Sequence, residues 1–293
     1  MSARPLENYV AVVTGSSRGI GKGIATELGT AGATVYVTGR SRAAGAHPLG
    51  GSVQETADLV SSSGGAGIPI VCDHSDDEQI KALFDQVARE HGRLDLLVNN
   101  ATTFPADIIA PPPFWSKSIA LANQISVGLR SAYVASYYAA PLLLESSRGL
   151  IVNISYYGAV SYHLDPAYGA TKAGLDKLTS DMAQDFKPFG VTVVSLWPGP
   201  TTTEMAVSLI SALPGGTEVM ASFESPQFTG RVVAALAQDP GLATQSGETL
   251  IGAEAAVRYG ITDTDGSQPP SLRARLGAPA KHGSTTSIST GSA

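Results

Sequence analysis

The sequence of 293 residues predicts an α/β protein in which a doubly wound parallel sheet of seven strands is covered by helices on both faces. Short apolar runs rich in valine and isoleucine alternate with longer helical stretches, and this alternation is typical of βαβ units. It continues without a break almost to the end of residues 1–265, so we expect a single domain there. Hydrophobic residues make up 43% of the chain, which is enough to bury a sheet on both faces.

Seven runs are expected to form the strands, because each is short, apolar and bounded by turn residues. These runs are Val10–Val13, Thr34–Thr38, Ile68–Cys72, Leu94–Val98, Leu150–Ile154, Val191–Leu196 and Thr249–Ile251. The stretches between them are expected to be helical. The predicted helices are Gly21–Ala31, Gly51–Ser62, Asp77–Glu90, Ile119–Glu145, Tyr168–Phe186 and Ser225–Ala237. In an open sheet of this kind, ligands bind beyond the carboxyl ends of the strands.

Several segments fall outside this alternation. The loop Ser41–Gly50 contains small residues, Thr102–Pro113 is rich in proline, and Thr201–Phe228 mixes apolar residues with glycine and proline, as in a lid over a substrate. Residues 266–293 are rich in Pro, Ser, Thr and Gly, and this composition predicts a flexible tail. The alternative for Leu272–Leu276 is a helical turn that docks on a partner.

The composition excludes several classes of function. The formal charge of −6 and the isoelectric point near 5.3 argue against nucleic acid or an anionic membrane as a partner. Cys72 is the single cysteine, and its apolar neighbours predict a buried core thiol. No Cys/His spacing fits a metal site, so we expect no bound metal. We find no signal peptide and no apolar run of the ~18 residues that a membrane span needs, and we expect a cytoplasmic protein.

A glycine-rich segment, Thr14–Gly21, directly follows the first predicted strand and precedes the first predicted helix. Glycine at such a place lets the backbone approach a pyrophosphate, and the helix amides then face its negative charge. The second strand is followed by Arg40, where an acidic residue would bind the ribose 2′-hydroxyl of NAD. Together with Arg18, this guanidinium can face a 2′-phosphate, so we expect NADPH to be favoured over NADH. The alternative is that both arginines are only solvated.

The segment Tyr168-Gly-Ala-Thr-Lys172 places a phenol and an ammonium about one helical turn apart. A nearby cation favours the phenolate and lowers the pKa of the phenol, so the pair predicts a group that exchanges protons near neutral pH. Ser155 lies upstream, directly after the strand Leu150–Ile154.

The ordered set of these three motifs resembles the short-chain dehydrogenase/reductase family, and the resemblance extends over about residues 8–265. It implies a Rossmann fold. Further matches are Asp73, Leu97–Ala101 and Pro198–Thr203. Three more runs resemble one branch within the family, namely Val127–Arg130, Ser195–Gly199 and Arg258–Asp263.

The resemblance implies an NADP(H)-dependent oxidoreductase that interconverts a carbonyl and a secondary alcohol. Ser155 would orient the substrate oxygen, Tyr168 would exchange its proton, and Lys172 would lower the phenol pKa and bind the nicotinamide ribose. The implied cofactor contacts are Gly15, Ser17, Arg18, Gly19, Ile20, Gly21, Arg40, Asp73, His74, Asn100, Ala101, Tyr168, Lys172, Pro198, Gly199, Thr201 and Thr203. The alternatives are an NAD-dependent alcohol dehydrogenase with the same site and a nucleotide-binding protein with little turnover. The small-molecule substrate itself is not specified, although the lid suggests a hydrophobic one.

Gly128 stands where the family usually has an asparagine that supports a water relay to the lysine. Either the relay side chain is missing, in which case asparagine fits at this position, or the glycine lets a neighbouring backbone pack closely; we prefer the first. His163, in a loop that should border the pocket, is expected at the surface, and the alternative is that it binds a substrate. The predicted helix Ile119–Glu145 is apolar around more of its circumference than a helix with one buried face would be. The resemblance implies that it pairs with the same helix of a second subunit. We therefore expect a homodimer or homotetramer that the substitution Ala135→Glu would dissociate.

Overall fold

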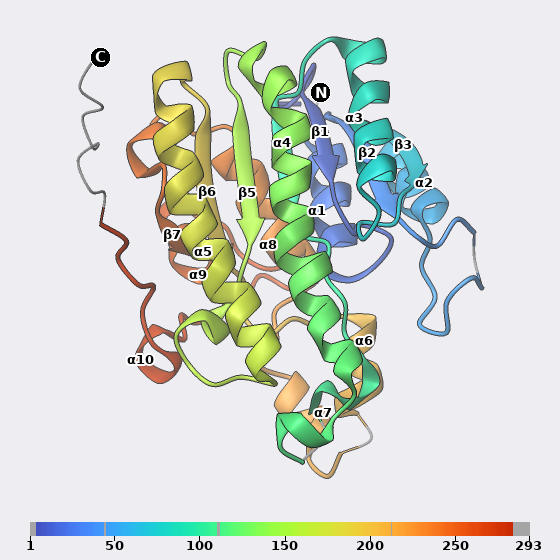
Figure 1. The fold of residues 1–293 in the computed structure, drawn as a ribbon, viewed down its shortest axis with the longest axis vertical. Coiled ribbons are helices and arrows are strands. Elements are labelled where there is room, and N and C mark those ends of the chain that lie inside the picture. Colours follow the sequence, from blue (N-terminus) through green and yellow to red (C-terminus); the bar gives the residue numbers. More distant parts are fainter. Residues whose placement is uncertain (1–3, 44, 110–111, 212, 284–293) are drawn as a thin grey trace, which may run out of the picture.

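The computed structural model describes residues 4–43, 45–109, 112–211 and 213–283, and in this part of the chain seven strands form one sheet (Figure 1). The strands are β1 (Val10–Val13), β2 (Thr34–Gly39), β3 (Ala66–Val71), β4 (Leu96–Asn99), β5 (Leu150–Ile154), β6 (Thr192–Trp197) and β7 (Thr249–Ile251). Every neighbouring pair is parallel, in the order β3-β2-β1-β4-β5-β6-β7. This confirms the predicted doubly wound fold.

Each face of the sheet has its own hydrophobic core, because side chains alternate along every strand. Val13 belongs to one core and Val12 to the other, and both are fully buried. The first face is covered by α1 (Gly19–Thr30), α2 (Val53–Ser62), α8 (Pro226–Leu236) and α9 (Gly252–Tyr259). The second face is covered by α3 (Asp77–His91), α4 (Ser131–Leu144) and α5 (Pro166–Phe186). Cys72 lies in the second core and is fully buried, as predicted.

The helix α5 begins at a strong N-terminal signal that the sequence contains. Pro166 occupies the first turn, where its missing N–H costs nothing, and the Asp165 carboxylate accepts a hydrogen bond from the Ala167 N–H at 2.9 Å. The sequence predicted that the helix starts at Tyr168, and these two residues move its start to Pro166. The phenol of Tyr168 therefore projects from an ordered first turn.

The prediction of one helix over Ile119–Glu145 is wrong. The chain forms a 3₁₀ turn at Ile119–Ala122, a π-helical turn at Ile125–Arg130 and only then α4. Gly128 lies in the π turn and is so close to α5 that a Cβ there would lie 2.7 Å from Thr171 Cγ2. Because Thr171 is fully buried, it has no free space into which to move. The expectation that asparagine fits without strain is therefore wrong. Gly128 does allow close packing, but its near neighbour is the Thr171 side chain and not the backbone that the packing alternative named.

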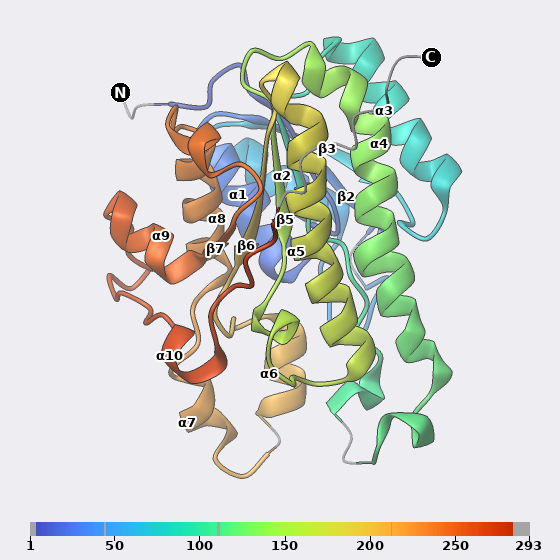
Figure 2. The ribbon, with the colours of Figure 1, turned by 60° about the vertical axis from the view of Figure 1, so that its left-hand side comes forward.

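A third layer lies beyond the carboxyl ends of the strands, toward which the β5 arrowhead points in Figure 1. Figure 2 shows this end with α6 (Glu204–Ile210) and α7 (Gly216–Met220) from the predicted lid, and α10 (Arg273–Leu276) from the C-terminal region. The segment between β4 and α4, with the 3₁₀ turns Ala106–Ile109 and Phe114–Ser116, completes the layer. The β5–α5 loop lies at this end as well. Four separate parts of the sequence thus meet where ligands are expected to bind.

The C-terminal region packs on the chain's own surface over part of its length. Leu272 and Leu276 are half-buried against the hydrophobic cluster that contains Tyr157 and Trp197. The helical turn that we considered as a partner-docking element therefore contacts its own chain. The flexibility of residues 266–293 stays a prediction, and residues 284–293 lie outside the described part.

Candidate active site

A cavity of about 840 Å³ lies at the carboxyl ends of β1, β2 and β4, where the strand order reverses. The predicted cofactor residues that line it are Gly15, Ser17, Arg18, Gly19, Ile20, Gly21, Arg40, Asp73, His74, Asn100, Ala101 and Thr203. The predicted residues that are not part of its wall are Tyr168, Lys172, Pro198, Gly199 and Thr201. The glycine-rich segment, the end of the second strand and the Asn100 segment are thus brought together, as the sequence predicted.

The glycine-rich segment is held by close backbone contacts. Gly15 has φ +64°, a left-handed conformation that favours glycine, and a Cβ there would lie 2.8 Å from Ala101 Cα. At Gly21 a Cβ would lie 2.4 Å from Asn100 Nδ2. The Asn100 amide in turn donates to the Thr14 carbonyl oxygen at 2.8 Å. Asn100 thus fixes the shape of the loop, in addition to lining the cavity.

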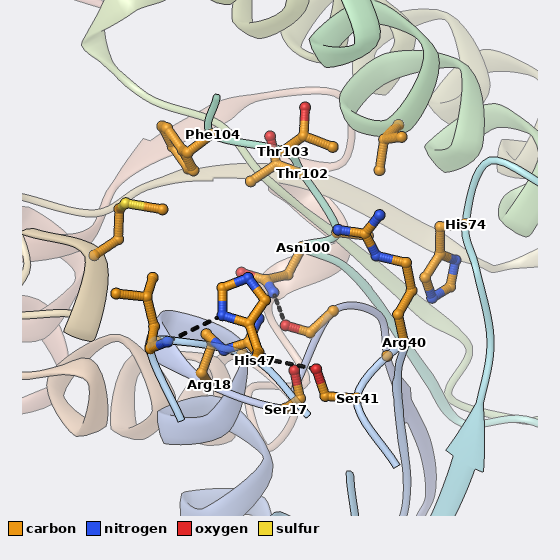
Figure 3. A pocket seen from close by; sticks show the side chains of 18 of the residues that line it. Ser17, Arg18, Arg40, Ser41, His47, His74, Asn100, Thr102, Thr103 and Phe104 are labelled. Carbon is orange, nitrogen blue, oxygen red and sulfur yellow. Dashed lines mark hydrogen bonds between the residues drawn. The ribbon is translucent and has the colours of Figure 1, made fainter. Parts of the chain in front are cut away.

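One side of the cavity carries positive charge (Figure 3). Arg18 donates to the Gly50 carbonyl at 2.9 Å and to Ser41 Oγ at 2.9 Å, so it holds the loop after β2 with neutral acceptors. Burial, together with the charges of Arg18 and Arg40, lowers the pKa of His47. The two predicted arginines therefore act on the same region of the cavity.

Asp73 and His74 are also part of the cavity wall, but each has a structural partner. Asp73 Oδ1 accepts hydrogen bonds from the Ser75 N–H at 2.9 Å and from its hydroxyl at 2.8 Å, as in a loop cap. His74 Nε2 pairs with Thr38 Oγ1 at 2.7 Å, and burial lowers the pKa of His74 to about 4, so this ring is neutral. His74 Nδ1 is buried without a hydrogen-bond partner among the described residues.

A carboxylate from the lid contacts the glycine-rich segment. Glu204 Oε2 accepts a hydrogen bond from the Gly19 N–H at 2.8 Å, at the first residue of α1. A helix N-terminus attracts negative charge, so this carboxylate occupies a position suited to a phosphate. The sequence reasoning missed this contact. The available signal was an acidic residue directly after the predicted cofactor contact Thr203.

The loop after β6 is shaped mainly by its own contacts. Thr201 Oγ1 donates to the Gly199 carbonyl at 2.9 Å, and Thr203 Oγ1 caps α6 by accepting from the Ala206 N–H at 3.1 Å. Glu224 anchors this loop. Its backbone N–H donates to the Pro200 carbonyl at 2.9 Å, and its buried carboxylate accepts from Thr229 Oγ1 at 3.2 Å.

The three predicted catalytic residues lie together where β5 meets α5. Ser155 Oγ donates to the Lys172 carbonyl oxygen at 3.0 Å, and Lys172 Nζ donates to the Ile154 carbonyl oxygen at 2.9 Å. Lys172 Nζ lies 5.5 Å from the centroid of the Tyr168 ring. All three side chains are buried, and Tyr168 is only 5% exposed.

The pKa directions differ from the prediction for Tyr168. Burial raises the pKa of its phenol well above the ordinary value, and the nearby Tyr156 adds to the increase. The predicted lowering by Lys172 is therefore not observed in this structure. Burial lowers the pKa of Lys172 to about 8, while the Asp176 carboxylate on the next turn of α5 opposes that shift.

Aromatic side chains surround the Tyr168 phenol, and the sequence reasoning did not identify most of them. The ring centroids of Phe104, Tyr156 and His163 lie 6.0, 6.2 and 5.9 Å from that of Tyr168. His163 is half-buried, so the prediction of a surface histidine is wrong. Phe104 lines the cofactor cavity as well, so it adjoins both the cavity and the phenol.

Between residues 4 and 283, outside the gaps given above, no three His, Cys, Asp or Glu side chains are grouped so that they could hold a metal ion. Over the same described residues, no helix has the length and apolar character required to cross a membrane.

The family model described as "short chain dehydrogenase" matches residues 9–213 of this chain. The mouse and human proteins named dehydrogenase/reductase SDR family member 1 are each 40% identical to it. The alignments cover 89% and 90% of this chain, and 85% and 86% of the mouse and human proteins. The solved structure of a short-chain dehydrogenase/reductase from Serratia marcescens is 29% identical, with a TM-score of 0.71. That match covers 84% of this chain and 97% of the Serratia chain.

These matches confirm both resemblances, to the family and to one branch within it, since that branch is the one that the mouse and human proteins represent. Together with the parallel seven-stranded sheet, they support an oxidoreductase that uses a nicotinamide dinucleotide. The chain belongs to the short-chain dehydrogenase/reductase family of enzymes.

Proposed function

We propose that the protein reduces a carbonyl compound to a secondary alcohol with NADPH and catalyses the reverse oxidation with NADP⁺. One observation carries the proposal. Ser155, Tyr168 and Lys172 are brought together at the carboxyl end of β5, beside a cavity whose glycine backbone and arginines suit a dinucleotide.

The residues around the cavity fit this cofactor. Gly15 and Gly21 line the cavity, and a side chain at either position would clash with the Asn100 segment, so only glycine allows this backbone to lie where a pyrophosphate would bind. Arg18 and Arg40 supply positive charge for a 2′-phosphate, while no acidic residue follows β2 at the position that would bind a free ribose hydroxyl. This supports NADPH over NADH.

The cofactor supplies or accepts the hydride when it is bound. In the reduction, the Tyr168 hydroxyl donates its proton to the carbonyl oxygen as negative charge develops there. A phenol whose pKa is raised by burial keeps its proton until that charge forms, which suits the acid role. When the substrate binds, the Ser155 hydroxyl turns away from the Lys172 carbonyl oxygen, to which it donates in this structure, and donates a hydrogen bond to the substrate oxygen instead. Lys172 Nζ provides a positive charge close to the phenol.

The assay is NADPH consumption with a panel of aliphatic, cyclic and aromatic carbonyl compounds, repeated with NADH. We expect turnover of at least one class, with NADPH preferred by about tenfold or more, or ~1.4 kcal/mol. Activity with NADH that equals activity with NADPH would leave the family reaction intact but remove the cofactor assignment. No oxidation of either cofactor across the panel would contradict the proposed reaction.

We also propose that two copies associate through α4 and α5. Tyr133 and Tyr137 on α4 are 57% and 65% exposed, and Phe189 after α5 is 63% exposed. These rings surround an apolar groove between the two helices, which self-association would cover.

Ala135 lies in the core rather than on this face, so Ala135→Glu is not a test of the interface. Tyr137→Glu tests it: sedimentation should show a dimer or tetramer for the parent and a monomer for the variant. A parent that sediments as a 30.0 kDa monomer at micromolar concentration contradicts the association.

The cytoplasmic location stays a prediction from the sequence.

A further inference from the structure

The segment Ser271–Gly277, which we term the C-terminal strap, contacts the aromatic cluster around the reactive phenol. Leu272 and Leu276 pack against a cluster whose members include Tyr156, Tyr157 and Tyr168. The strap also lies beyond residue 213, where the match to the shared family pattern ends.

Polar contacts fix the strap in place. The Leu272 N–H donates to the Tyr157 hydroxyl at 3.1 Å. Arg273 forms two parallel bonds with the Glu254 carboxylate on α9, from Nε at 2.8 Å and from Nη2 at 2.6 Å. Ser271 Oγ donates to the same carboxylate at 2.7 Å. Paired Arg–carboxylate bonds of this kind fix direction as well as distance, so they set the register of the strap on α9.

The far end of the strap is fixed by packing. A Cβ at Gly277, where φ is +104°, would lie 3.0 Å from Val160 Cγ2 in the loop between β5 and α5. That loop carries Tyr156 and His163, whose rings adjoin the Tyr168 ring. The charge of Arg275 acts on the Tyr156 phenol, which places this guanidinium close to the same ring. The strap thus spans from α9 to the loop that surrounds the phenol, as its position beside the lid end in Figure 2 indicates.

We propose that the C-terminal strap forms one wall of the substrate site and that Leu272 and Leu276 select carbonyl compounds with a bulky apolar group. This inference rests on the proposed carbonyl reduction. The apolar part of the substrate contacts the part of the strap leucines that the cluster leaves exposed, while its oxygen faces Tyr168. A small ketone reaches the phenol without contacting the strap, so only bulky substrates depend on it.

The test compares 2-acetonaphthone, as the bulky ketone, with butanone, as the small one. Arg273→Glu removes the ion pair with Glu254 and detaches the strap, and the double variant Arg273→Glu/Glu254→Arg restores a pair of opposite charges. Leu276→Ala removes only one apolar contact and is the variant least prone to misfolding. Val257→Ala, at a 64% exposed position on α9, is the matched control.

We expect Arg273→Glu to raise KM for 2-acetonaphthone at least about tenfold and Leu276→Ala to raise it several-fold, the usual scale for lost apolar contacts. Values of kcat/KM for butanone should change by less than about twofold, and the charge swap should restore the bulky substrate. Equal changes for both ketones, no loss with the bulky one, or no recovery in the swap would overturn the inference.

A second readout separates this inference from the proposed function. Because NADP⁺ cannot donate a hydride, the dissociation constant of 2-acetonaphthone from the NADP⁺-saturated enzyme reports binding without turnover. If the parent enzyme reduces neither ketone but this constant rises in Arg273→Glu and recovers in the swap, the strap assignment holds and the proposed reaction fails. If the parent enzyme does not bind 2-acetonaphthone, the strap assignment fails.

Discussion

The cofactor end and the substrate end of this site are built in different ways. The cofactor end is an open cavity formed by the segments that follow β1, β2, β3, β4 and β6, and the close contacts of its glycine-rich segment belong largely to the backbone. At the substrate end, the Tyr168 phenol is 5% exposed beneath side chains that come from distant segments. Backbone geometry tolerates little variation, whereas a wall of side chains can change without altering the reaction. The difference explains how one fold keeps a cofactor while its members act on different substrates.

The largest stability effect is expected at Glu224, which joins the lid to the loop after β6. Burial raises the pKa of this carboxyl from 4.5 to about 8, against hydrogen bonds from Gly199 and Thr229 that lower it. Between pH ~4.5 and about 8, the folded protein keeps the Glu224 proton that the unfolded chain has lost. The stability linked to this proton is therefore fully present below pH ~4.5 and is lost as the pH rises through about 8.

In Glu224→Gln the side chain no longer titrates. We expect the variant to match the parent in thermal unfolding at pH 5 and to be more stable at pH 9, by roughly 2–4 kcal/mol. Glu218→Gln, on the exposed side of α7, serves as the control. A parallel pH dependence in the Glu224→Gln variant and its parent would show that this carboxyl is not the titrating group.

The next effect concerns the close packing of the π turn against α5. Gly128→Ala should lower the free energy of unfolding by about 1–3 kcal/mol, because the added Cβ meets Thr171 Cγ2. Thr171→Ser removes that methyl group, so the double variant should lose less than the sum of the two single variants. Additive losses in denaturant titrations would mean that Gly128 is required for another reason.

Arg40 tests the cofactor end alone. Arg40→Asp places an acidic residue after β2, and it should erase or reverse the preference for NADPH, a change of about tenfold or more in relative affinity. The exposed Arg42, which is not part of the cavity wall, provides the control Arg42→Asp. Titration of nicotinamide fluorescence with both cofactors measures the change. The assignment fails if the preference survives Arg40→Asp, or if Arg42→Asp abolishes it equally.

The smallest expected effect comes from Glu204, whose carboxylate bonds to the Gly19 N–H in the phosphate region. Glu204→Gln removes negative charge that competes with the cofactor, so NADPH affinity should rise roughly three- to fivefold, or just under 1 kcal/mol. The gain should shrink at high salt, because screening weakens the repulsion. Weaker binding in the variant would indicate that Glu204 supports the loop rather than competing with a phosphate.

The contrast between a cofactor end built from local motifs and a substrate end built from distant segments explains what could be predicted from the sequence. The strand order follows from the alternation of apolar runs and helical stretches along the chain, and the structure confirms it. Ser155, Tyr168 and Lys172 belong to short local motifs, and the structure brings them together at the end of β5, although Tyr168 and Lys172 are not part of the cavity wall. The close approach of Gly128 to Thr171 depends on the packing of two helices, which no local pattern encodes. The strap residues reach the phenol's surroundings through tertiary contacts, among them the ion pair between Arg273 and Glu254, and no local sequence pattern specifies such contacts.

The central claim is that Tyr168 donates the proton during carbonyl reduction, and Tyr168→Phe tests it most directly because it removes the hydroxyl and little volume. The control is Tyr162→Phe, which removes an 82% exposed hydroxyl from the preceding loop. On the substrate identified from the carbonyl panel, Tyr168→Phe should lower kcat at least about 10²-fold, with NADPH affinity and thermal midpoint retained. Turnover near the parent value, with the cofactor bound normally, would contradict the account.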